Sequence, residues 1–156
     1  MSELDALYQQ IILDHAKARH GAELNAAQAA AVPDAYGVGQ SHQLNPVCGD
    51  EITLRLEVKD GQVEAVRWYG DGCAISMASA SMLTDLAQGV APAAFRQVID
   101  HFREVLRSRG TTEADEETLG DAAALSGVSK FPARVKCAML SWVAAEDALR
   151  QATAGT

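Results

Sequence analysis

Three cysteines and one aspartate are the residues of this sequence best suited to chemistry. They fall in three regions of the chain: Cys48 with Asp50, then Cys73, and finally Cys137. Three thiolates and a carboxylate make a four-ligand set that suits zinc, and soft sulfur ligands also suit iron-sulfur clusters. No Cys-x-x-Cys pair is present, so the fold must assemble the set. The alternative is that the cysteines are inert, buried small hydrophobic residues.

The neighbours of these residues bear on their reactivity. Cys73 is expected to open a helix, where the positive end of the helix dipole lowers the pKa of a thiol and favours the thiolate. Arg134 and Lys136 stand beside Cys137 and add positive charge for the same effect, unless both are ordinary solvated helix residues. Asp50 is either a metal ligand or merely the cap of a turn, where aspartate is common.

Other polar residues are left out of the predicted site. No histidine neighbours a cysteine in the sequence, and surface histidines are the commoner case, which excludes His15, His20, His42 and His101. The serines at positions 76, 79 and 81 are interpreted as part of a small-residue packing face. No histidine and acid partner can be assigned to them from the sequence, so a serine nucleophile is not predicted.

An antiparallel sheet is predicted in the middle of the chain. Residues 52–58 alternate apolar and polar side chains, Asp60-Gly61 suits a tight turn, and residues 63–69 form the returning strand. A preceding strand through residues 42–45 makes the sheet three-stranded, and such a sheet needs helices over one face. Gly49 and Gly72 would let the backbone approach closely near the cysteines.

Helices are predicted in the sequence before and after the residues of this sheet. Apolar residues at helical spacing, with proline at two helix starts and glycine at one helix end, indicate helices near 4–12, 75–88, 92–108 and 132–151. Ser2 and Asp5 can cap the first of them. Residues 21–31 are predicted to be a connecting loop, and the acidic stretch 113–121 a solvated loop with one short helix. The fold class is therefore α+β, a small three-stranded antiparallel sheet packed against about four to five helices.

Composition narrows the class of protein. A chain of 156 residues with 48% hydrophobic content suits one domain, residues 1–156. The net charge of −8 and the scattered basic residues argue against nucleic acid as a partner. No apolar stretch approaches the roughly 20 residues of a membrane span, and the first residues do not follow a signal-peptide pattern. A cytoplasmic location is expected, where thiols stay reduced and available to metals.

Four motifs together resemble the U-type iron-sulfur cluster assembly proteins, and they span almost the whole chain: Leu7-Tyr8 with Ile12-Leu13-Asp14-His15, Asn45-Pro46-Val47-Cys48-Gly49-Asp50, Gly70-Asp71-Gly72-Cys73-Ala74-Ile75-Ser76, and Arg134-Val135-Lys136-Cys137. The chain is most similar to the SufU branch, because Lys136 stands where IscU-type scaffolds have a histidine. Phe131-Pro132-Ala133-Arg134-Val135-Lys136 also replaces the Leu-Pro-Pro-Val-Lys motif by which IscU recruits its chaperone. The segment between the last two cysteines is longer than in IscU, as in SufU proteins.

The resemblance implies a function as well as a SufE/NifU-like fold. It implies that Cys48, Asp50, Cys73 and Cys137 bind one zinc ion. It further implies that Cys48 leaves the metal and accepts persulfide sulfur from a SufS-type cysteine desulfurase, helped by Arg134, with downstream cluster-assembly proteins as further partners.

Two alternatives to this zinc-dependent sulfurtransferase stay open. One is a scaffold that builds a [2Fe-2S] cluster, with iron or the cluster on the same ligands. The other is a small structural zinc protein that only binds partners, in which metal removal unfolds the chain. The choice among them decides whether the protein is a sulfur-accepting transferase or a non-enzymatic scaffold.

Overall fold

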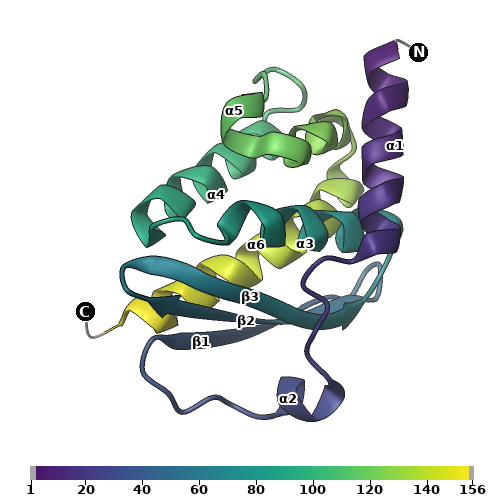
Figure 1. Ribbon diagram of the computed structural model, residues 1–156. Coiled ribbons are helices and arrows are strands. Elements are labelled where there is room, and N and C mark those ends of the chain that lie inside the picture. Colours follow the sequence, from purple (N-terminus) through teal and green to yellow (C-terminus); the bar gives the residue numbers. More distant parts are fainter. Residues whose placement is uncertain (1–2, 155–156) are drawn as a thin grey trace.

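The structure is a computed structural model that describes residues 3–154, so the predicted cap at Ser2 lies outside the described residues. Figure 1 shows the elements in chain order: α1 (Glu3–Ala18), α2 (Ala26–Ala30), β1 (Val38–Asn45), β2 (Asp50–Lys59), β3 (Gln62–Asp71), α3 (Ala74–Ala87), α4 (Pro92–Arg107), α5 (Glu116–Leu119), the 3₁₀ segment η1 (Gly120–Lys130) and α6 (Pro132–Thr153).

The sheet has the predicted antiparallel order β1-β2-β3. The β2–β3 turn is formed by Asp60 and Gly61, both at positive φ (54° and 76°), as a tight hairpin turn of this hand requires. Asn45 at the end of β1 pairs with Asp50 at the start of β2, so the chain between them is a short turn at one end of the sheet. The predicted α+β fold is confirmed.

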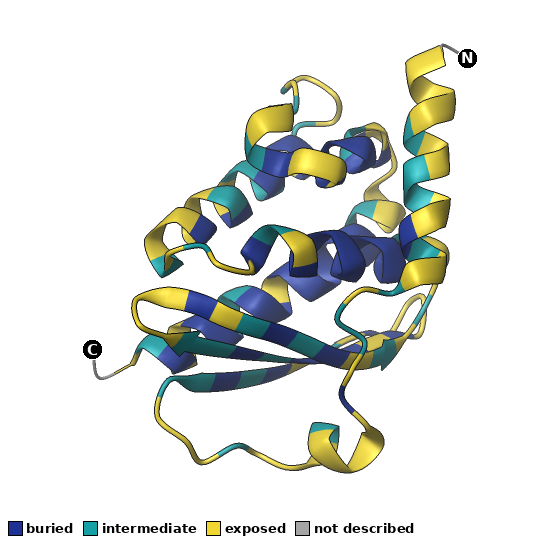
Figure 2. Cartoon of the chain, viewed as in Figure 1, coloured by how far each residue is buried: buried dark blue, intermediate teal, exposed yellow. Residues whose placement is uncertain are grey.

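Helices α1, α3, α4 and α6 gather over one face of the sheet, and α2 lies on the other side (Figure 1). The long α6 packs directly on β1 and β2. In the core, the rings of Phe102 from α4 and Trp142 from α6 stack with their centroids 4.0 Å apart. Figure 2 shows buried residues concentrated in α3 and α6, and buried residues interspersed with more exposed ones along the strands.

The segment predicted as a connecting loop contains the short helix α2. Asn25 begins it with a capping box: its side chain accepts from the Gln28 N–H at 2.8 Å, and the Gln28 side chain accepts from the Asn25 N–H at 2.9 Å. The loop prediction is wrong here because five residues are too few to show an apolar period, although the Asn-x-x-Gln pattern was a usable signal. The acidic stretch does contain one short helix, α5, begun by the side chain of Asp115.

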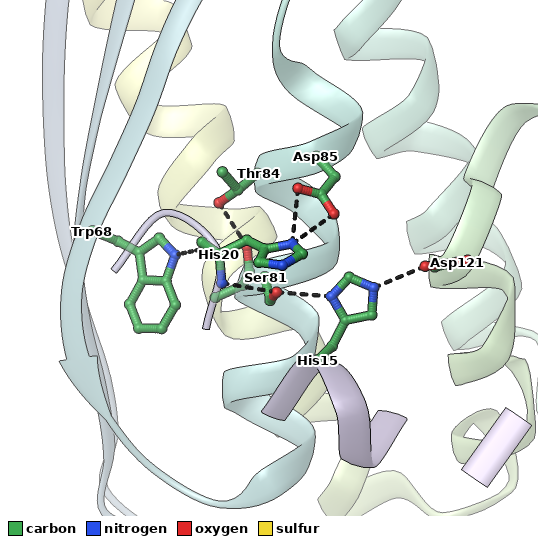
Figure 3. A network of polar contacts seen from close by, with 8 residues as sticks. His15, His20, Trp68, Ser81, Thr84, Asp85 and Asp121 are labelled. Atoms are coloured by element: carbon green, nitrogen blue, oxygen red, sulfur yellow. Dashed lines mark hydrogen bonds and ion pairs between the residues drawn. The ribbon is translucent and has the colours of Figure 1, made fainter. Parts of the chain in front are cut away.

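His15 is buried, with 6% of its surface exposed, which corrects its interpretation as a surface residue. Figure 3 shows its ring between α3 and η1, with Nδ1 2.7 Å from Ser81 Oγ and Nε2 2.8 Å from Asp121 Oδ2. Ser81 thus has a histidine and an acid nearby, contrary to the expectation from sequence. Its hydroxyl is nevertheless fully buried and also accepts the His20 N–H at 3.0 Å, so this network ties elements together and offers no accessible nucleophile.

In residues 3–154, none of the helices combines the length and apolar character needed to cross a membrane.

Candidate metal centre

The turn between β1 and β2 carries Cys48 at its exposed tip. The side-chain Oδ1 of Asn45 accepts the Val47 N–H at 3.2 Å, and the backbone oxygen of Asn45 accepts the Gly49 N–H at 2.8 Å. Gly49 has a φ of 74°, a left-handed conformation that glycine adopts without steric penalty. These bonds fix the turn that carries Cys48.

Asp50 and Cys73 meet across the end of the sheet. Asp50 begins β2 and is 1% exposed, whereas Cys73 is exposed and is the N-cap residue of α3, as predicted. The Cys73 N–H donates to Asp50 Oδ1 at 2.9 Å, and Cys73 Sγ lies 4.0 Å from Asp50 Oδ2. Cys73 Sγ is also 3.5 Å from the hydroxyl of Ser76.

Cys137 comes from the second turn of α6 and is buried. Its Sγ lies 3.5 Å from Cys48 Sγ, well beyond the roughly 2.05 Å of a disulfide bond, and 3.7 Å from the Ala133 carbonyl oxygen. Ligand atoms of Cys48, Asp50 and Cys137 lie within 4.8 Å of one another. Cys73 joins this group through Asp50, so the fold brings all four predicted ligands to one place.

The pKa values of Cys137 and Asp50 are shifted in opposite directions within this group. Burial strongly raises the pKa of the Cys137 thiol, and its contacts with Asp50 and the two other cysteines raise it further. For Asp50, burial acts to raise the pKa, but hydrogen bonds from Cys137, the Cys73 backbone and Ser76 outweigh it and lower the pKa. Without a cation the carboxylate is therefore ionised while the buried thiol keeps its proton.

The donor set fits a zinc ion. Tetrahedral coordination with zinc-sulfur bonds of about 2.3 Å places two sulfur ligands roughly 3.7 Å apart, close to the 3.5 Å between Cys48 and Cys137. A divalent cation would also balance the negative charge of the ionised Asp50 and of the cysteine thiolates. Three sulfur atoms and one carboxylate oxygen make a complete four-ligand set.

Gly72 determines how closely the chain before α3 approaches Asp50. A Cβ atom at this position would lie 2.6 Å from Asp50 Oδ1. We expect Gly72→Ala to push the carboxylate out of place and weaken zinc binding about 10- to 100-fold, the usual cost of disturbing a ligand's supports. Competition with a chromophoric zinc chelator measures this effect.

The control for Gly72→Ala is Gly127→Ala. A Cβ atom at Gly127 meets nothing within 4 Å, so this variant should bind zinc as the wild type does. Equal zinc affinity in Gly72→Ala and wild type would show that Asp50 does not depend on this close approach.

Arg134 lies at the exposed start of α6, where its guanidinium carbon sits 5.6 Å from the centroid of the Phe131 ring. Both residues line a hollow of about 920 Å³ between α1, η1 and α6, together with Ile75, two residues after Cys73. The four candidate ligands are not among the described residues that line this hollow. Arg134 thus lies on an exposed hollow, three residues before Cys137 on α6.

Sequence reasoning missed two residues that support this centre. Ser76 was interpreted as a packing residue, yet its hydroxyl contacts Cys73 and its hydrogen bond lowers the pKa of Asp50. Its position three residues after a helix-opening cysteine was the available signal, because side chains at an N-cap and at N3 commonly interact. Asn45 was predicted to lie in the first strand and in a motif but not to support the site, although asparagine before a turn commonly accepts the backbone N–H two residues on.

Known proteins resemble this chain over nearly its whole length. The family model of the NifU-like N terminal domain matches residues 7–138. The zinc-dependent sulfurtransferase SufU of Bacillus subtilis is 38% identical over 154 residues, covering 99% of this chain and 97% of that protein. The iron-sulfur cluster assembly scaffold protein IscU of Streptococcus pyogenes is 33% identical, covering 97% and 87%.

A solved structure agrees with these sequence relatives. The putative iron-sulfur cluster assembly scaffold protein for the SUF system from Fervidobacterium islandicum superposes with a TM-score of 0.73 at 28% identity, over 92% of this chain and 97% of that one. The fold, the converging cysteines and the length of chain matched all support the same family assignment. The chain therefore belongs to the NifU-like N-terminal domain family of iron-sulfur cluster assembly scaffold proteins.

Proposed function

We propose that this protein is a zinc-dependent sulfurtransferase that accepts persulfide sulfur from a SufS-type cysteine desulfurase for cluster assembly. The observation that carries the proposal is the unequal exposure of two neighbouring thiols. Cys48 is exposed at the tip of its turn, while Cys137, 3.5 Å away, is buried in α6. The Cys48 residue can thus be reached by a partner protein, while Cys137 stays buried in α6.

The sulfur transfer requires a deprotonated Cys48. Its sulfur attacks the outer sulfur of the donor cysteine persulfide, a sulfur-sulfur bond forms on Cys48, and the donor's own sulfur-sulfur bond breaks. The donor cysteine leaves as a thiolate, so no oxidant or reductant is consumed. Bound zinc would keep the cysteines as thiolates and protect them from oxidation.

The surroundings of Cys48 suit an encounter with another protein. Arg134 and Phe131, a few residues before Cys137, present a basic and an aromatic side chain, and both line the hollow described above. Arg134 is assigned the role of stabilising the negative charge on the donor's sulfur as it leaves, since its guanidinium is permanently charged. Lys136 is also exposed on α6, but two residues on from Arg134 it faces another side of the helix.

A [2Fe-2S] scaffold is the second candidate. Cys73 is exposed as well as Cys48, so two of the four candidate ligands face solvent, as the transfer of a whole cluster requires. The Streptococcus pyogenes relative, 33% identical, carries a scaffold name. The same ligand set serves either proposal, because thiolates bind zinc and iron-sulfur clusters alike.

Metal analysis and a desulfurase assay distinguish the two. For the sulfurtransferase we expect about one zinc per chain and a faster desulfurase turnover when the protein is added. Iron with acid-labile sulfide after anaerobic reconstitution, and a desulfurase rate unchanged by the protein, would instead support the scaffold.

A further inference from the structure

Two buried polar atoms among residues 3–154 have no hydrogen-bond partner: Nδ2 of Asn45 and Oγ of Ser141. Buried donors are paired in the great majority of cases, so an unpaired one indicates a missing acceptor. Both residues lie near the candidate metal centre in the sequence. Asn45 is three residues before Cys48, and Ser141 is one helical turn after Cys137.

The orientation of the Asn45 side-chain amide follows from the hydrogen bond that its oxygen accepts from Val47. The Val47 N–H needs an acceptor, and the side-chain oxygen of Asn45 provides it at 3.2 Å. A flipped amide would set two donors against each other, so the NH₂ group is the half without a partner. The same turn carries Cys48, so the amide is tied to the segment that holds this thiol.

The strand register places this NH₂ group on the side of the metal centre. Asn45 and Asp50 are directly opposite partners in the β1–β2 ladder, so their side chains lie on the same face of the sheet. Asp50 is 1% exposed and Asn45 6%, and this face is the one that α6 covers. The amide therefore points into the layer that also holds Cys137.

The acceptor that the amide lacks would appear when the centre is loaded. In the metal-free chain the Cys137 thiol acts as a donor towards Cys48 Sγ. On metal binding it loses its proton, and a thiolate sulfur accepts hydrogen bonds but donates none. A fixed N–H beside newly formed negative charge stabilises that charge, which is the usual role of groups around metal ligands.

We propose that Asn45 is a positioning residue of the centre, whose side-chain N–H donates to the Cys137 sulfur once that sulfur has become a metal ligand, and so strengthens metal binding. The inference rests on the proposed function, because it takes the four residues as metal ligands. It adds a residue that contributes no ligand atom. It also explains why a buried donor stays unpaired in the metal-free chain.

The test compares Asn45→Ser with Gln43→Ser. A serine at position 45 still offers an oxygen to the Val47 N–H, but it lacks the NH₂ group. Gln43 lies on the same strand, and its amide already donates to Ser41 Oγ at 3.0 Å, which makes it a matched control. Zinc affinity is measured by chelator competition, and the ligand environment by the sulfur-to-cobalt charge-transfer band of the Co²⁺-loaded protein.

We expect Asn45→Ser to bind zinc about 10-fold more weakly than wild type. Its charge-transfer band should move to lower energy, because a thiolate that loses a hydrogen bond gives up an electron more readily. Gln43→Ser should match the wild type in both. Wild-type affinity or an unshifted band in Asn45→Ser would overturn the inference while leaving the sulfurtransferase proposal standing. A wild type that binds neither metal would overturn both.

Discussion

Cys48→Ala is expected to abolish sulfur acceptance from a cysteine desulfurase while leaving the fold intact. Cys48 supplies the only exposed sulfur on the β1–β2 turn, and alanine has no atom that can form a persulfide. Loss of a nucleophile commonly lowers a rate by roughly 10³-fold or more, which here means a return to the rate of the desulfurase alone. Because the side chain is exposed, the free energy of unfolding should change by less than about 0.5 kcal/mol.

The measurement is desulfurase turnover, paired with mass spectrometry of the persulfide on this chain. Val47→Ala is the matched control, since Val47 is the neighbouring residue on the same turn and is 78% exposed. The control should accept sulfur as the wild type does. If Cys48→Ala still gains the mass of a sulfur atom, the acceptor is another cysteine and the mechanism proposed for Cys48 is wrong.

Among the proposed substitutions, Gly39→Ala is expected to lower the free energy of unfolding the most. Gly39 lies on β1 directly under α6, and a Cβ atom there would be 1.9 Å from the Ala148 carbonyl oxygen and 3.0 Å from the Ala152 nitrogen. Both are backbone atoms of a helix, which cannot move aside as a flexible side chain can. Overpacking of this kind costs about 3 kcal/mol, which lowers Tm by roughly 6–12 °C for a chain of this length.

Thermal unfolding of the metal-free protein measures this effect. Gly127→Ala serves again as the control, because it adds the same methyl group where nothing lies within 4 Å. We expect the control to be neutral or slightly more stable, since alanine restricts the unfolded chain more than glycine does. A Tm for Gly39→Ala equal to that of the control would mean that α6 does not pack on β1 as closely as the structure places it.

The sequence alone determined the local elements and the identity of the candidate ligands. Alternating side chains and the Asp60-Gly61 turn predicted the β2–β3 hairpin, and apolar spacing predicted the longer helices, because these signals depend on near neighbours in the chain. Cysteine is rare and chemically distinctive, so the ligand candidates could be identified without a fold. The short helix α2 was missed because its stabilising contacts are two capping bonds and no apolar stripe.

Tertiary structure decided what the sequence left open. Only the packed chain shows that Cys48 is exposed while Cys137 is buried, that His15 is enclosed, and that Asn45 has an unpaired amide. Each of these depends on segments that are distant in sequence: the two neighbouring thiols, for example, are 89 positions apart along the chain. Burial and contact distance arise from how α6 and α3 pack on the sheet, and no local pattern of residues encodes that packing.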